Sequence, residues 1–133
     1  MTNFDLANLD ALTENQDAGI PLAVRHPVTQ EPMGWTIRVA GVDSERVKKV
    51  LKRQRNSRLK NAQRQLTADL LDAQNREVLV ACVISWSFDE DVSINGEQPE
   101  CTPEKADQLI RRWPWLGAQI EERAQDTAAF LES

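Results

Sequence analysis

The sequence predicts an α+β fold in which an N-terminal β-hairpin is followed by a mainly α-helical domain. Three observations support this prediction. Apolar residues alternate with other residues over two short stretches between residues 20 and 40. After residue 44 the apolar residues recur at helical spacing instead, and helix-capping residues precede these stretches. The strands therefore come first and the helices afterwards, without the strand–helix–strand alternation of an α/β protein.

The composition is that of one globular domain with few residues suited to catalysis. Of the 133 residues, 41% are hydrophobic and 28% are charged, which is typical of a globular chain. One histidine and two cysteines leave little from which to build a nucleophilic or metal site. The longest apolar run, Val78–Ile84, has seven residues, whereas a membrane span needs roughly 20. The first residues also lack the pattern of a secretory signal, so we expect a cytoplasmic protein.

The N-terminal segment, residues 1–18, is polar and acidic and contains few large apolar side chains. We expect it to be a weakly ordered tail, with at most a short helical turn, that lies outside the core. Residues 19–133 are then expected to form a single domain.

The first expected elements are two strands of a hairpin over about residues 20–40. Ile20–Val24 and Trp35–Val39 both alternate apolar with other residues, which indicates half-buried strands. The connection between them contains Pro27, Pro32 and Gly34 and suits a turn between antiparallel strands.

The next expected element is a basic helix over about residues 44–64. Asp43 or Ser44 can cap its first turn. The stretch Lys52–Arg58 contains no apolar residue, so the apolar stripe that would anchor the helix is interrupted. We expect this helix to lie across the surface or to project from it, and a break near Asn56 fits the sequence.

A second helix is expected over about residues 67–86. Thr67 can cap it, and the apolar residues that follow have helical spacing. The run Val78–Ile84 fits either a buried helix or a core strand, and the spacing before it favours the helix. We expect this helix to be the central and most buried element, followed by a turn at Asn95–Gly96.

Two further helices are expected over residues 103–112 and 114–131. Thr102–Glu104 supplies a capping hydroxyl, a proline in the first turn and an acidic residue near the positive end of the helix dipole. Pro114 interrupts this helix and can open the last one.

Charge is divided unevenly along the chain. Counting Lys and Arg against Asp and Glu, residues 1–44 carry −4, 45–64 carry +8, 65–88 carry −2 and 89–133 carry −7. The basic patch comprises Arg46, Lys48, Lys49, Lys52, Arg53, Arg55, Arg58, Lys60 and Arg64. Such a patch can attract phosphate, an acidic partner protein, or the acidic C-terminal third of the same chain or another copy. Self-association is therefore one expectation.

No motif predicts a catalytic, cofactor or metal site. Asp91–Gly96 resembles the opening of a calcium-binding loop, but Thr102 stands where that loop needs a bidentate carboxylate. His26 is the only histidine, so every histidine-dependent catalytic arrangement would depend on it. We expect Cys82 to be a small buried apolar side chain.

The tryptophans are the candidate partner-binding residues. Trp113 and Trp115 bracket Pro114, and tryptophan is common both in cores and as an anchor at interfaces. We expect at least one of the two to pack in the core. The other, with Phe130 and Leu131, is the candidate partner-binding patch.

Four short passages follow one another in a recognisable order. They are Gly19–Leu22 through His26–Pro27 to Met33–Gly34 and Gly41–Ser44, then Val83–Trp86, then Ile94–Gly96, then Thr102–Ala106 running into Trp113–Leu116 and Phe130–Leu131. Together they resemble the tail assembly chaperones of long-tailed bacteriophages and prophages, over about residues 19–131.

This resemblance implies a non-enzymatic protein of the bacterial host cytoplasm. Such a chaperone keeps the tape measure protein in solution and helps recruit tail tube subunits to it. The resemblance also implies a longer form made by ribosomal frameshifting. The alternative is a small nucleic-acid-binding or regulatory protein that uses residues 45–64, although the acidic total charge and the lack of aromatic residues between Trp35 and Trp86 disfavour it.

Overall fold

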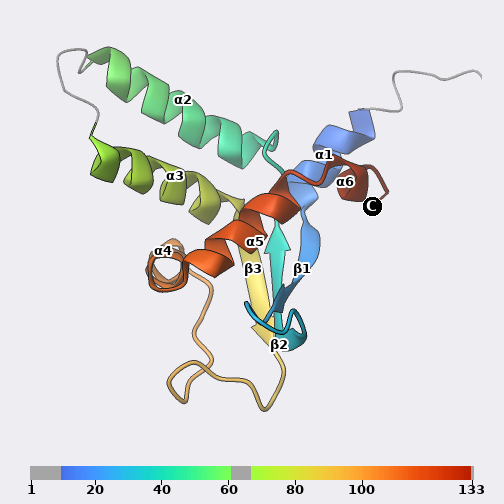
Figure 1. The fold of residues 1–133 in the computed structure, drawn as a ribbon. Helices are drawn as coiled ribbons and strands as arrows, with labels where there is room; N and C mark the ends of the chain where they lie inside the picture. Colours follow the sequence, from blue (N-terminus) through green and yellow to red (C-terminus); the bar gives the residue numbers. More distant parts are fainter. Residues whose placement is uncertain (1–9, 61–66, 133) are drawn as a thin grey trace, which may run out of the picture.

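A three-stranded antiparallel sheet of order β1-β2-β3 lies in the body of the molecule (Figure 1). The strands are β1 (Ile20–Arg25), β2 (Pro32–Val39) and β3 (Val83–Phe88) in the computed structural model, which describes residues 10–60 and 67–132. β1 and β2 form the predicted hairpin, in which Leu22 pairs with Ile37. Helices make up most of the rest, so the predicted α+β fold class is confirmed.

One face of the sheet is buried and the other is exposed, as the alternation in the sequence requires. In β1, Leu22 and Val24 are buried while Pro21 and Ala23 are exposed. Helix α5 (Pro114–Ala124) packs near β1 and β2 and contributes buried residues such as Leu116 and Ile120 to the same core.

Side chains of α5 also occupy the outer edge of β1. Gln119 accepts a hydrogen bond from the backbone N–H of Arg25 at 2.9 Å and donates one to its carbonyl at 2.8 Å. Arg123 donates to the carbonyl of Pro21 at 3.0 Å. These bonds satisfy backbone groups at a sheet edge and fix the position of α5.

Helices α2 (Glu45–Lys60) and α3 (Ala68–Cys82) lie side by side and project from the sheet (Figure 1). The basic helix runs through Asn56 without interruption, so the suggested break is wrong. Its expected end, residues 61–64, lies outside the described residues. We call α2 and α3 together the helical arm.

The predicted helix 67–86 is wrong beyond Cys82. There the helix ends, and the chain continues as β3. In this strand Trp86 pairs with Ile37 of β2. A seven-residue apolar run conceals this change because it has neither period 2 nor period 3.6. The run Val78–Ile84 is also less buried than expected, since only Cys82 and Val83 in it are fully buried.

Helix α4 (Pro103–Arg112) occupies the predicted residues, and the Thr102 hydroxyl accepts a hydrogen bond from the N–H of Lys105 at 3.1 Å.

The predicted helix 114–131 is wrong in one respect. It is divided into α5 and α6 (Thr127–Glu132), and the Asp126 carboxylate accepts a bond from Ala129 N at 3.2 Å between them. Aspartate competes with helix continuation by capping in this way.

The predicted tail is wrong for residues 10–18, which form helix α1 (Asp10–Ala18); residues 1–9 lie outside the described part. Gln16 is buried. Its side-chain Oε1 accepts a hydrogen bond from Asp43 N at 2.7 Å, and its backbone carbonyl accepts another from Gly41 N at 3.0 Å. Asn15 donates to the carbonyl of Phe130 at 2.7 Å. These hydrogen bonds connect α1 to the segment after β2 and to α6.

Candidate partner-binding surfaces

All four tryptophans and Phe88 come together in one group, which we call the aromatic cluster. The Trp35 ring stacks on Phe88, with centroids 5.3 Å apart and planes 15° apart, and meets Trp86 edge-on at 5.7 Å. Trp113 meets Trp35 edge-on at 6.4 Å and stacks on Trp115 at 5.6 Å. Aromatic pairs at these separations are favourable beyond the area they bury.

The sheet and the α4–α5 junction position these rings. Trp35 and Phe88 are directly paired across β2 and β3, so their side chains share one face of the sheet. Trp113 lies between α4 and α5, with non-helical backbone angles that end one helix before Pro114 begins the next. Trp115 then stands in the first turn of α5, beside Trp113.

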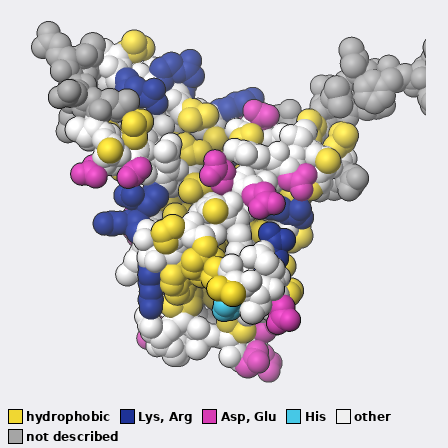
Figure 2. All heavy atoms as spheres, in the orientation of Figure 1, with side chains coloured by type: hydrophobic (Ala, Val, Ile, Leu, Met, Phe, Trp, Pro, Cys, Tyr) yellow, Lys and Arg dark blue, Asp and Glu magenta, His cyan; other side chains and the backbone are white. Residues whose placement is uncertain are grey.

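Most of the aromatic cluster remains partly accessible to solvent. Trp35 is 4% exposed, whereas Trp86, Phe88, Trp113 and Trp115 are only half-buried. Figure 2 shows hydrophobic side chains gathered on this side of the molecule, below α5 and beside β3. Partly exposed tryptophans supported by a rigid core are typical anchors of protein interfaces.

Polar groups hold two of these indoles in place. Trp86 Nε1 donates a hydrogen bond to the Pro99 carbonyl at 2.9 Å. The Arg112 guanidinium lies 4.9 Å from the centroid of the Trp113 ring, within the range of a cation–π interaction.

The predicted partner-binding patch is only partly correct in its geometry. Trp113 and Trp115 lie together and both pack against the core. Phe130 is 0% exposed, so it is a core residue and offers no surface to a partner. Leu131 is 50% exposed, but it belongs to α6, at the other end of α5 from the tryptophans (Figure 1). The break at Asp126 turns Phe130 inward, and helical spacing alone does not reveal it.

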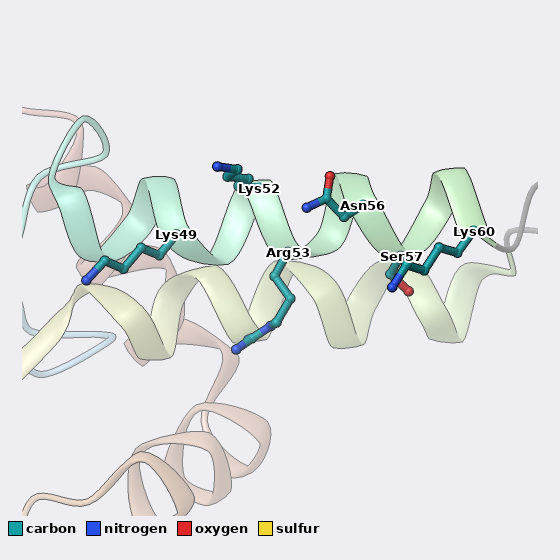
Figure 3. A pocket seen from close by; sticks show the side chains of 6 residues that line it. All are labelled: Lys49, Lys52, Arg53, Asn56, Ser57 and Lys60. Atoms are coloured by element: carbon teal, nitrogen blue, oxygen red, sulfur yellow. The ribbon is translucent and has the colours of Figure 1, made fainter.

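The basic patch forms the second candidate surface. Helix α2 contains eight basic residues and one acidic residue, and all eight are exposed. Several line an open hollow of about 510 Å³ along the helix. Figure 3 shows Arg53 directed toward α3, where it meets Glu77, whereas Lys52 points away from α3. Arg64 lies outside the described residues.

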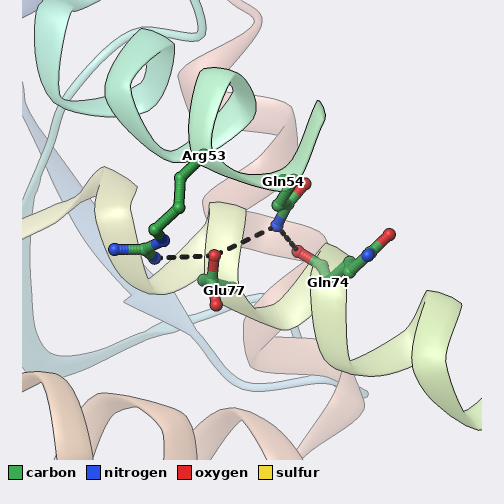
Figure 4. Close-up of polar contacts among 4 residues, drawn as sticks. All are labelled: Arg53, Gln54, Gln74 and Glu77. Atoms are coloured by element: carbon green, nitrogen blue, oxygen red, sulfur yellow. Dashed lines mark hydrogen bonds and ion pairs between the residues drawn. The ribbon is translucent and has the colours of Figure 1, made fainter. Parts of the chain in front are cut away.

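Polar contacts of Arg53 and Gln54 tie α2 to α3 (Figure 4). Arg53 forms an ion pair with Glu77 at 2.7 Å. The buried Gln54 donates to the Gln74 carbonyl at 3.0 Å and to the Glu77 carboxylate at 3.3 Å. Among the described residues, the other seven cations of α2 have no ion-pair partner, so the arm presents positive charge to solvent.

The histidine and the cysteines have structural surroundings. His26 Nδ1 accepts hydrogen bonds from the N–H groups of Val28 and Thr29 at 3.1 and 3.2 Å, in the turn between β1 and β2. Cys82 is 1% exposed, as predicted, and burial raises the pKa of its thiol to about 11. Within residues 10–60 and 67–132, no cluster of His, Cys, Asp or Glu could hold a metal ion.

The acidic stretch after β3 contains the predicted turn. Asn95 and Gly96 both have positive φ, and Ile94 and Glu97 exchange backbone hydrogen bonds of 2.7 and 3.1 Å. This geometry is that of a tight hairpin turn, for which Asn-Gly is favoured.

Comparisons with known proteins identify no relative. No protein family, no curated protein and no solved structure matches this chain. In the described part of the chain, no helix is both long and apolar enough to cross a membrane. Function is therefore inferred from the aromatic cluster and the basic patch.

Proposed function

We propose that this protein is a non-enzymatic tail assembly chaperone of a long-tailed bacteriophage or prophage, active in the cytoplasm of the host. It binds the tape measure protein and helps recruit tail tube subunits during tail morphogenesis. The observation that supports this best is the aromatic cluster, in which three half-buried rings contact the buried Trp35 and the half-buried Trp115 stacks on one of them. Such a surface can cover apolar side chains of a protein client.

The expected client has matching chemistry. A tape measure protein is a long helical protein with apolar stripes, which aggregate unless another surface covers them. The half-buried indoles of Trp113 and Trp115 offer such a cover, while the exposed charges of the helical arm keep the assembly in solution.

Co-expression tests this proposal. The chain is produced together with the longest coiled-coil-like open reading frame encoded near its gene, and the soluble fraction is purified through a tag on the chain. The client is expected to stay in solution and to copurify. Trp115→Ala is expected to reduce the copurified client several-fold, because it removes one exposed face of the aromatic cluster.

Leu131→Ala is the matched control, because Leu131 is also an exposed apolar residue but lies on α6. It is expected to leave the yield of client unchanged. Equal loss in both variants would contradict a role for the aromatic cluster. A client that stays insoluble with this chain and also with its longer frameshifted form would overturn the chaperone proposal.

The alternative function is that of a small nucleic-acid-binding or regulatory protein. It is favoured by the seven exposed cations of α2 that have no ion-pair partner among the described residues. It predicts DNA or RNA binding that weakens steeply with salt. Replacing Lys48, Lys49, Lys52 and Arg53 by glutamine should then abolish binding, whereas the chaperone proposal predicts that the client is still bound.

A further inference from the structure

A groove lies between α2, α3 and the segment that leads into α4, and no residue of the aromatic cluster lines it. Its volume is about 310 Å³. Val80 and Ile84 contribute apolar surface from α3 and β3, and Val50 contributes it from α2. Arg46 and Arg53 of α2 and Cys101 before α4 also line it.

The groove exposes apolar surface that the fold itself does not cover. The run Val78–Ile84 contains only apolar residues, yet Val80, Ala81 and Ile84 are half-exposed where they line the groove. A helix that is apolar on all sides is normally buried on all sides. Contiguous exposed apolar surface of this kind marks a binding site, because covering it is favourable by roughly 25 cal/mol per Å².

The charge around the groove is positive. Arg46 and Arg53 are exposed, and Arg46 has no ion-pair partner among the described residues. The only acidic residue in the lining is Glu77, which is already bound by Arg53 and Gln54. The helix that bears these arginines has a net charge of +7 over its sixteen residues. An occupant therefore needs carboxylates beside its apolar residues.

We infer that this groove binds an acidic amphipathic helix of a protein partner. The apolar stripe of that helix lies over Val80 and Ile84, and its flanking carboxylates meet Arg46 and Arg53, in the manner of other helix-in-groove complexes. A nucleic acid fits less well, because its phosphate backbone gains nothing from covering the apolar surface of the groove. This site goes beyond the proposed function, because it is a second surface and its occupant need not be the tape measure protein.

Synthetic helical peptides of about 20 residues serve as probes, because that length spans about 30 Å of helix. One has a leucine stripe flanked by glutamate, the second has the same stripe flanked by lysine, and the third keeps glutamate but has serine in the stripe. Fluorescence anisotropy with the full chain is expected to show binding of the first peptide only. Equal binding of the serine peptide, or of duplex DNA of the same length, would overturn the inference.

Charge reversal on the two faces of α2 locates the site. Arg46→Glu is expected to weaken binding of the acidic peptide about tenfold. Arg55→Glu is the matched control, because nine residues at 3.6 per turn place it about 180° around the helix. Arg55→Glu is expected to change binding of the acidic peptide less than about twofold. Trp115→Ala is also expected to change it less than about twofold, because Trp115 does not line the groove, and this result separates the test of the groove from the test of the chaperone proposal. Equal weakening by the two charge reversals would show non-specific attraction and overturn the inference.

Cys101 provides a direct footprint of the groove. Its side chain is half-exposed there, whereas Cys82 is fully buried, so alkylation by iodoacetamide reports mainly on Cys101. Burial raises the pKa of the Cys101 thiol, so the reaction is followed at mildly alkaline pH. Saturating acidic peptide is expected to slow alkylation about tenfold or more, and Cys101→Ser should abolish the signal. An unchanged rate with peptide bound would place the peptide elsewhere.

Discussion

The aromatic cluster and the helical arm are built in opposite ways. The aromatic cluster joins residues from β2, β3 and the α4–α5 junction, which are far apart in the chain. The described residues of the basic patch lie on one helix, α2, which is tied to its neighbour by Gln54 and Arg53. The first surface therefore depends on the whole tertiary structure, whereas the second depends on a local helix pair. Substitutions should act globally in the first region and locally in the second.

Trp35→Ala should have the largest effect, because it removes the buried ring that contacts three other rings of the cluster. The free energy of unfolding should fall by about 3–5 kcal/mol, as for other buried aromatic residues. Urea unfolding measures this change, and the near-UV circular dichroism of the remaining tryptophans should decrease. A loss below about 1 kcal/mol would show that the cluster is not part of the cooperative core.

Cys82 tests the point where the arm meets the sheet, since it ends α3 directly before β3. Burial raises the pKa of its thiol from 9.0 to about 11. The folded state therefore holds the proton more tightly than the unfolded state. The contribution of the protonated Cys82 thiol to the free energy of unfolding is therefore fully present below pH 9, and it is lost as the pH rises toward 11.

At 1.36 kcal/mol per pKa unit, the expected loss is roughly 2–3 kcal/mol by pH 11. The measurement is urea unfolding at several pH values, with Cys82→Ala as the control that lacks this titration. Parallel pH profiles for the two proteins would show that the thiol at this junction is not protected from solvent.

Local patterns in the sequence predict those parts of the fold that local forces determine. Alternation in Ile20–Val24 and Trp35–Val39 predicts the hairpin, because each strand buries one face. The capping residue Thr102 predicts the start of α4, because its hydroxyl satisfies a free backbone N–H. Neither prediction needs information from another part of the chain.

The parts that depend on distant partners could not be predicted in this way. The change from helix to strand after Cys82 depends on pairing with β2, and α1 is held by hydrogen bonds that Gln16 accepts from the N–H groups of Gly41 and Asp43. The sequence indicated Trp113 and Trp115 as binding residues. It did not show that Trp35 and Trp86 join them, because strand pairing brings those side chains together.

Gln54→Ala should have an intermediate effect that is confined to the arm. Gln54 is buried between α2 and α3, and its loss leaves the Gln74 carbonyl without this donor. We expect a loss of about 1–2 kcal/mol, because the substitution removes two hydrogen bonds of a buried amide, one of them to a carboxylate. Hydrogen exchange should accelerate in α2 and α3, while the amides of β1 and β2 keep their protection. Equal acceleration in the sheet would contradict the independence of the two regions.

Arg53→Gln should have the smallest effect. The ion pair with Glu77 is short at 2.7 Å, but its side chains are 67% and 42% exposed, so solvent screens the attraction. The free energy of unfolding should fall by at most about 0.5 kcal/mol, and the difference should vanish at high salt because mobile ions screen exposed pairs. Lys52→Gln is the matched control, since it removes a cation from the same helix without breaking an ion pair among the described residues. If both substitutions stabilise the chain at low salt, repulsion among the cations of α2 outweighs the Arg53–Glu77 ion pair. The positive charge of the arm then lowers the free energy of unfolding, which is what a surface selected for binding rather than for stability would show.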